Sequence, residues 1–147
     1  AMVMLFARAV LYVMTQAAII DTVIHFLAQF VIGKSPIITG NLLLWMQTII
    51  NFFVPSGSGQ AAITIPILIP LSDLGNVTRQ VCCLASQYGD GFSNFIYPTN
   101  GTLLGILVAA GIPYKRWFKF FAPLFAIIML LCMVFVSVGV AIHLGPF

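Results

Sequence analysis

Residues 117–144 limit most strongly what this chain can fold into. The run is almost entirely apolar, with one early proline, Pro123, and few polar side chains, among them Ser137 and His143. A helix needs roughly 20 apolar residues to cross the hydrocarbon core of a bilayer. Residues 117–144 exceed that length, so they predict a C-terminal transmembrane helix.

The composition extends this prediction to the whole chain. Of its 147 residues, 61% are hydrophobic and only 6% are charged, whereas about a quarter are charged in a typical soluble domain. The net charge of +3 is too small and too clustered to indicate a nucleic-acid partner. We therefore expect an all-α membrane protein whose main surroundings are the lipid bilayer.

The first apolar block, residues 1–33, carries a polar stripe. Three of its members recur at i, i+4 and i+8, which places them on one helical face, and a threonine lies beside the first: Asp21, His25, Gln29 and Thr22. Such a stripe is typical of a helix in the membrane interface or against a protein partner. We expect residues 3–17 to end a membrane crossing and residues 18–33 to form an interfacial arm.

Two shorter apolar runs, 37–54 and 61–74, flank a glycine- and serine-rich turn. We expect a re-entrant hairpin over residues 37–74, because each arm is short for a full crossing. The tip predicted to lie at membrane depth comprises Ser56, Gly57, Ser58, Gly59 and Gln60. The N–H groups of the second arm, starting near Ala61, would favour an anion there. The alternative is an external loop between two separate helices.

Residues 77–111 would span the membrane as one helix if their centre were not filled with helix-breaking and polar residues. We expect a discontinuous helix broken across Gly89–Gly101, because broken helices bind ions and solutes near the midplane. The candidate site residues there are Gly89, Asp90, Gly91, Asn94, Pro98, Thr99 and Asn100. An acidic residue at membrane depth is usually functional, so Asp90 is the leading candidate. Its alternative role is a structural cap at the break.

The sequence offers little to an enzyme. It holds no Ser/His/Asp set, paired carboxylates or phosphate-binding loop, and its three cysteines (Cys82, Cys83 and Cys132) lie in apolar runs without metal-ligand spacing. We expect no catalytic activity and no cofactor. A coupling ion, sodium or a proton, is expected, with sodium placed near Ser58, Asp90 and Asn94.

Several motifs, in this order and spacing, resemble the YfcC-like family of four-carbon-dicarboxylate carriers in the ion transporter superfamily. They are ARAVLYVMTQAAIIDTVIH, NFFVPSGSGQAAITIPI, then RQ, YGDGFSNFIYPTNG and IPYKRWFKF. Members carry dicarboxylates, and some basic amino acids. The superfamily uses two inverted repeats, each with a re-entrant hairpin and a broken helix. The resemblance implies that Ser56–Gln60 is the hairpin tip of the C-terminal repeat and Gly89–Gly101 its broken helix.

The expected function is therefore ion-coupled secondary transport of a small carboxylate or amino-acid-like solute. Family members are longer, and this chain resembles their C-terminal repeat only. We expect the other half of the site to come from the missing repeat or from a second copy in an antiparallel dimer. The alternative is a non-transporting subunit or truncated remnant that binds a partner.

Charged residues predict the orientation. Lys34, Asp73 and Arg79 are expected on one side of the membrane and Lys115, Arg116 and Lys119 on the other. The positive-inside rule places residues 112–119 in the cytoplasm of a multi-pass protein of the bacterial inner membrane.

Overall fold

The computed structural model describes residues 25–26 and 28–145 of the chain. Throughout these ranges the regular structure is helical and no strand occurs. The helices are α3 (Pro36–Phe53), α4 (Gly57–Leu74), α5 (Arg79–Ser93), α6 (Gly101–Ala109) and α7 (Tyr114–Ala141). The predicted all-α class is confirmed.

Most of the predicted N-terminal crossing and arm lies outside the described residues, including Asp21 and Thr22 of the polar stripe. The other two stripe residues, His25 and Gln29, are exposed. Gly33, with a φ of +78°, lies in the turn between this segment and α3.

Two of the described helices are long and apolar enough to cross a membrane. They are α7, whose 28 residues include an 18-residue stretch with a mean hydropathy of 2.9, and α3, with 18 residues and a mean hydropathy of 1.2. At 1.5 Å per residue α7 is about 42 Å long, more than the roughly 30 Å of a bilayer core. The helix starts and ends about one turn earlier than the predicted 117–144.

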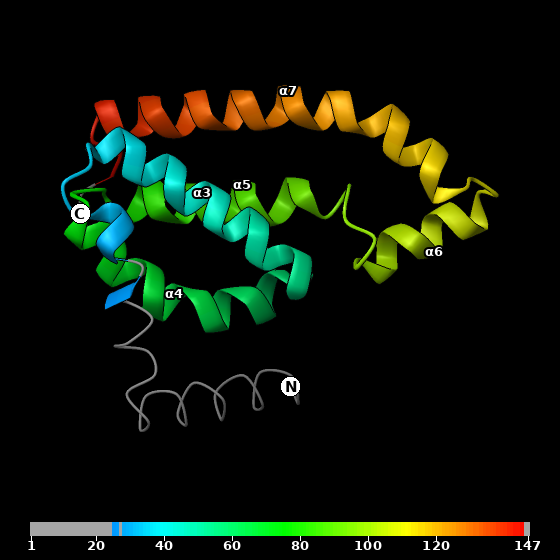
Figure 1. Cartoon of the computed structure of the whole chain (residues 1–147), viewed down its shortest axis with the longest axis horizontal. Helices are drawn as coiled ribbons and strands as arrows, with labels where there is room; N and C mark the ends of the chain where they lie inside the picture. The colour runs from blue at the N-terminus through cyan, green and yellow to red at the C-terminus, as the bar shows by residue number, and fades with distance from the viewer. Residues whose placement is uncertain (1–24, 27, 146–147) are drawn as a thin grey trace.

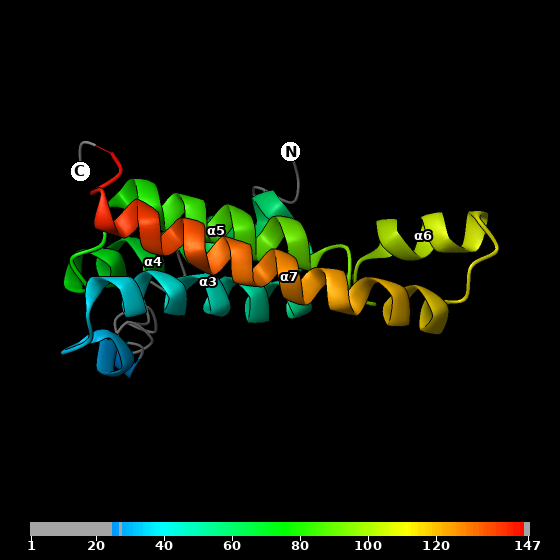
Figure 2. The ribbon, with the colours of Figure 1, turned by 90° about the horizontal axis from the view of Figure 1, so that it is seen from above.

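The helices form an elongated layered bundle. Figure 1 shows α7 along one side and α4 on the opposite side, with α3 and α5 between them. Helix α5 packs against α3, α4 and α7. In both views α6 projects beyond this bundle, beside the beginning of α7 (Figures 1 and 2). The fully buried centre of the bundle includes Leu43, Leu44, Leu68, Leu71, Val81, Ala85 and Val136.

Glycines allow the helices to approach closely. A Cβ atom on Gly89 would lie 2.8 Å from the Leu44 carbonyl oxygen and 3.0 Å from the Thr48 backbone nitrogen, both on α3. A Cβ on Gly40 would lie 3.0 Å from the Val136 side chain on α7. Small residues at such crossings are typical of helix packing in membranes.

The hairpin connection is shorter than the sequence predicted. Helix α4 begins at Gly57 instead of near Ala61, because the Ser56 hydroxyl accepts a hydrogen bond from the Gly59 backbone N–H and caps the first turn. Residues 57–60, predicted to form the tip, are therefore helical. The two arms have 18 residues each, so the second is longer than the sequence indicated.

The break between α5 and α6 is also narrower than predicted. The expectation that helical structure ends at Gly89 was wrong, since α5 continues through Asp90 and Gly91 to Ser93. The packing of Gly89 against α3 holds the helix there despite the poor helix propensity of glycine. Residues 94–100 are the non-helical part of the predicted Gly89–Gly101 break.

The outer surface of the bundle is apolar while its centre is partly polar. Helices α3 and α7 expose large apolar side chains, among them Trp45, Ile49, Phe120, Ile127, Leu130, Leu131, Val134 and Phe135. The buried polar side chains are Thr39, Gln47, Thr48, Asn51, Gln60, Thr64, Ser72 and Ser93. Apolar groups face outward in this way when the surrounding solvent is lipid, and polar groups then pair inside the bundle.

Candidate solute and ion site

The structure brings the predicted hairpin tip and the predicted helix break together. The Asp90 carboxylate on α5 lies against the first turn of α4, where a Cβ atom on Gly57 would be only 2.8 Å from Asp90 Oδ2. A helix N-terminus carries roughly half a positive charge. The sequence predicted that this terminus would favour an anion, and in the structure a carboxylate of the chain itself lies beside it.

Asp90 is linked to the next helix through two asparagines. Asn94 Nδ2 donates to Asp90 Oδ1 at 3.0 Å, and Asn100 Nδ2 donates to Asn94 Oδ1 at 2.8 Å. Asn100 is also the N-cap of α6, because its Oδ1 accepts from the backbone N–H groups of Thr102 and Leu103. The hydrogen bonds from Asn100 to Asn94 and from Asn94 to Asp90 therefore connect the start of α6 to the end of α5 across the break.

Asn51, near the end of α3, completes this group. Its side chain is fully buried, and its Nδ2 donates to the Asp90 carbonyl oxygen at 3.1 Å and to Ser93 Oγ at 2.7 Å. The Asn51 Oδ1 atom has no hydrogen-bond partner. We call the set Asn51, Gly57, Asp90, Asn94 and Asn100 the polar junction, because it joins α3, α4, α5 and α6 at one place.

Aromatic residues at the start of α7 hold the broken segment. The Tyr114 hydroxyl donates to the Ile96 carbonyl at 2.6 Å, and Trp117 Nε1 donates to the Phe95 carbonyl at 2.8 Å. Trp117 also stacks on Phe121, with ring centroids 5.3 Å apart. These two hydrogen bonds tie the start of α7 to the broken segment after α5.

A cavity of about 120 Å³ lies between α4 and α5, and we call it the α4–α5 cavity. One end of the cavity, which we call the inner end, is lined by Gly57 at the start of α4 and by Asp90 near the end of α5. Arg79, at the start of α5, lines the other end. Its polar lining includes Gln47, Gln60, Thr64, Ser86 and Gln87. The Gln47 amide nitrogen donates to Thr64 Oγ1 at 2.8 Å, while the Gln60 amide donates to the Gln47 carbonyl at 2.9 Å and to its side-chain oxygen.

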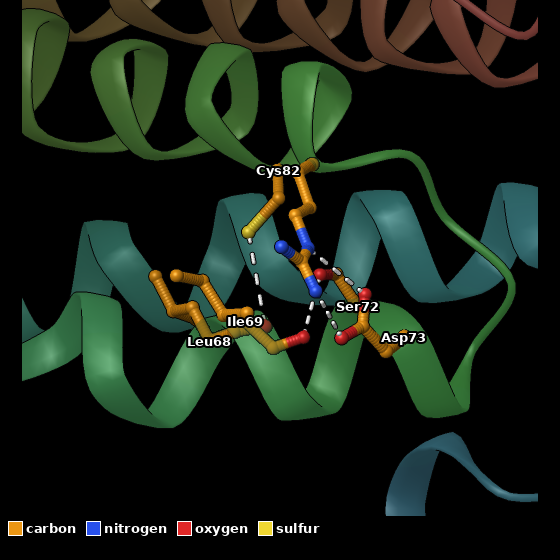
Figure 3. A network of polar contacts seen from close by, with 6 residues as sticks. Leu68, Ile69, Ser72, Asp73 and Cys82 are labelled. Atoms are coloured by element: carbon orange, nitrogen blue, oxygen red, sulfur yellow. Dashed lines mark hydrogen bonds and ion pairs between the residues drawn. The ribbon is translucent and has the colours of Figure 1, made fainter. Parts of the chain in front are cut away.

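Polar contacts between α4 and α5 lie at the Arg79 end of the cavity. Arg79 pairs with the Asp73 carboxylate at 3.1 Å, and both side chains are about half exposed. Figure 3 shows Asp73 and Ser72 on α4 facing the start of α5, with the Cys82 thiol directed toward the Leu68 carbonyl. Cys83, the next residue, is exposed and lines the cavity.

The structure separates the predicted site residues into distinct surroundings. Asp90, Asn94 and Asn100 meet Gly57 in the polar junction, and Gln60 lines the adjoining cavity. Ser56 caps α4, Gly59 packs on Ser56, and Gly89 packs against α3, which accounts for these three residues without a ligand. The remaining candidates, Ser58, Gly91, Pro98 and Thr99, are exposed.

Sequence reasoning missed the contribution of α3. Gln47 and Asn51 are spaced i, i+4 in an otherwise apolar helix, so they share one face. Amide side chains in such a position usually bond across helices in a membrane bundle. That spacing was a signal for the buried face of α3, although it could not reveal which helix would lie opposite.

Within the described ranges, no three His, Cys, Asp or Glu side chains gather into a metal site. The cysteines are reduced, with Cys82 and Cys132 buried and Cys83 exposed. The oxygen atoms at the junction are carboxylate and amide oxygens, which are the ligands of hard cations.

Comparison with known proteins gives the family. The family model described as "DcuC: C4-dicarboxylate anaerobic carrier" matches residues 1–141. The chain belongs to this family. It is therefore a membrane protein of a transporter family, as the sequence resemblance and the apolar helices predicted, and this family points to transport instead of catalysis.

Two curated relatives of this DcuC-family chain show how much of the protein it represents. It is 40% identical over 120 residues to the Escherichia coli (strain K12) protein named "Putative basic amino acid antiporter YfcC", covering 82% of this chain and 24% of the relative. It is 32% identical over 139 residues to an uncharacterized protein of Haemophilus influenzae (strain ATCC 51907 / DSM 11121 / KW20 / Rd), covering 93% and 27%. The chain thus spans about a quarter of the length of these relatives. No solved structure matches it significantly.

Proposed function

We propose that this chain forms one half of the binding site of an ion-coupled secondary transporter for a small carboxylate or amino-acid-like solute. The observation that carries the proposal is the polar junction, where the Asp90 carboxylate meets the N-terminus of α4 and the broken segment. Broken helices and helix ends are the means by which transporters bind ions and solutes. The family description names C4-dicarboxylates and the E. coli relative's name a basic amino acid, so both solute classes stay within the proposal.

The arrangement of the helices supports a re-entrant hairpin. In Figure 1 the connection between α3 and α4 lies level with the middle of α7 along the long axis of the molecule, while the other ends of both helices lie level with the end of α7. If α7 crosses the bilayer, the connection lies at membrane depth. The hairpin then enters and leaves on one side, as the sequence predicted, even though α3 alone is long enough for a crossing.

The same arrangement supports the predicted orientation. The start of α3 and the turn between α4 and α5 lie at the end of the molecule opposite the start of α7 (Figure 1). These two ends carry Lys34, Asp73 and Arg79 on one side and Lys115, Arg116 and Lys119 on the other. We propose an inner-membrane location with residues 112–119 in the cytoplasm, following the positive-inside rule.

The coupling ion is proposed to bind at Asp90 and Asn94. The partly buried Asp90 carboxylate has one side-chain donor among the described residues, Asn94, and an uncompensated charge at membrane depth costs several kcal/mol. Sodium or a proton would lower that cost when bound. Ser58, the third predicted sodium ligand, is exposed at the start of α4, so its contribution depends on the partner half.

Gradient-driven uptake tests the proposal. The chain, reconstituted in vesicles, should take up radiolabelled succinate or lysine when a sodium or proton gradient is applied. Asp90→Asn should reduce uptake at least about tenfold, since removing one favourable charge interaction of 1.4 kcal/mol has that effect. Lys34→Gln, which removes an exposed charge in the turn before α3, is the control and should retain uptake. Gradient-independent binding with no uptake would favour the alternative, a non-transporting membrane subunit.

A further inference from the structure

The α5 wall of the α4–α5 cavity is polar and does not suit lipid, whereas the α4 wall is largely apolar. The residues of α5 that line it include Arg79, Cys83, Ser86, Gln87 and Asp90, spaced so that they form a row along one helical face. Helix α7, with its exposed apolar side chains, lies on the opposite side of the bundle (Figure 1). Polar residues of membrane helices face protein or a water-filled space, so this face is directed toward water or another part of the transporter.

Polar groups in the cavity leave hydrogen-bond acceptors open. Gln60 is 2% exposed and lines the cavity, yet its Oε1 atom has no hydrogen-bond partner. The Gln60 amide nitrogen already donates a hydrogen bond to the Gln47 carbonyl oxygen. A buried carbonyl oxygen without a donor costs about 1–3 kcal/mol. Because this atom has less than 1 Å² of accessible surface, a water molecule, a cation or an ammonium group in the cavity reaches it only if the Gln60 amide shifts.

The charges along the cavity favour a positive ligand. Arg79, the cationic side chain lining it, is paired with Asp73. At the inner end the α4 terminus offsets only about half of the Asp90 charge. A net negative potential therefore remains at the inner end, beside the open acceptor on Gln60.

We propose that the α4–α5 cavity is a water-filled entrance through which a positively charged group reaches Asp90 from the Asp73–Arg79 end. The positive group is the coupling cation or the ammonium group of an amino-acid solute. This inference rests on the proposed transport function and adds to it the route and the charge of the ligand. It also predicts that the dianionic body of a dicarboxylate does not enter by this route.

The exposed thiol of Cys83 reports on the entrance directly. In vesicles containing the whole chain, Cys83 should react with a membrane-impermeant cationic methanethiosulfonate reagent and much less with an anionic one. Rates are expressed relative to those of a free thiol in solution, and tandem mass spectrometry separates Cys83 from the buried Cys82 and Cys132. We expect the normalised cationic-to-anionic ratio to exceed about 10, equivalent to 1.4 kcal/mol.

Variants of Asp90 test the origin of the preference. Asp90→Asn should lower the ratio to near 1, while Asp90→Glu, which keeps the charge, should retain it and shows that the fold tolerates substitution there. A ratio near 1 in the unmodified chain, or a preference for the anionic reagent, overturns the proposal. So does a ratio that Asp90→Asn leaves unchanged.

Protection by defined probes identifies the positive group. If Cys83 is labelled more slowly in a sodium salt than in the salt of a large organic cation, with no solute present, the positive group is the coupling cation. Slower labelling by lysine without sodium, but not by succinate, assigns it to the solute's ammonium group. Protection by succinate alone, or by none of the three, rejects the binding of a positive group here. The labelling experiment does not require transport. If the chain transports nothing but Cys83 still prefers the cationic reagent, only the proposed function is rejected. If the chain transports solute but Cys83 reacts equally with both reagents, only the proposed entrance is rejected.

Discussion

Gly89 and Gly91 lie two residues apart on α5 in opposite surroundings. A side chain on Gly89 would meet the backbone of α3, whereas Gly91 is exposed with no atom near the position of a Cβ. We predict that Gly89→Ala destabilises the chain by about 1–3 kcal/mol through overpacking. Gly91→Ala, the matched control, should stabilise α5 by up to about 1 kcal/mol through helix propensity. Thermal unfolding in detergent measures both, and equal effects would contradict the packing role of Gly89.

The surroundings of Asp90 are likewise formed largely by residues that are distant in sequence. The group consists of one carboxylate, amides from Asn51 and Asn94, and the backbone of Gly57. Asn51 was not among the candidates that the sequence indicated. Their distances to Asp90 make the carboxylate the centre of the polar junction.

Among the elements, the broken segment depends on α7 for its order. Trp117→Phe would keep the stacking on Phe121 but remove the donor to the Phe95 carbonyl. This hydrogen bond is exposed, so its loss costs about 0.5–1.5 kcal/mol. We predict faster hydrogen exchange in residues 94–100 as a result, measured by mass spectrometry.

Trp45→Phe is the matched control for that experiment, because the Trp45 side chain lies exposed on α3 and makes no hydrogen bond to the described part of the chain. It should leave exchange in 94–100 unchanged. The same acceleration in both variants would show that the Trp117 hydrogen bond does not order the segment.

The hairpin connection is the second element with a direct test. A cysteine replacing Ser58, or Ser56, should react slowly with impermeant thiol reagents in membranes, and solute should protect it, because we place the connection at membrane depth. Ser58 is the better site, since Ser56 caps α4. Lys34→Cys, in the turn before α3, should react fast. Equally fast labelling at Ser58 without protection by solute would indicate an external loop.

For the whole molecule, we predict that the site needs a partner. The hairpin and the break occur once in the described chain, and backbone at a break must be covered inside a membrane. We predict that a second hairpin and break complete the site, from an antiparallel copy or from the other repeat of a longer chain. Single cysteines at Ser58 and within residues 92–100 should then form tip-to-tip cross-links between copies in native membranes. A transport-competent monomer would contradict the homodimer.

The sequence by itself determined the class of the protein. The apolar run 117–144 and the scarcity of charge are properties of single segments, and they identify an all-α membrane protein without knowledge of any contact. The helix-breaking residues around 55 and 98 likewise located both interruptions. Their exact limits were wrong because Ser56 caps α4 and Gly89 packs on α3, and both effects depend on geometry in three dimensions.

The tertiary structure alone decided which candidates share a site. Sequence spacing describes one face of one helix, so it could not pair Asp90 with Gly57, or Gln47 with Thr64 and Gln60. Sequence spacing also could not show that Gly89 packs against α3 while its neighbour Asp90 belongs to the polar junction. Whether a polar residue in an apolar helix binds a neighbouring helix or a ligand depends on what lies opposite, and only the packing of α3, α4 and α5 supplies that.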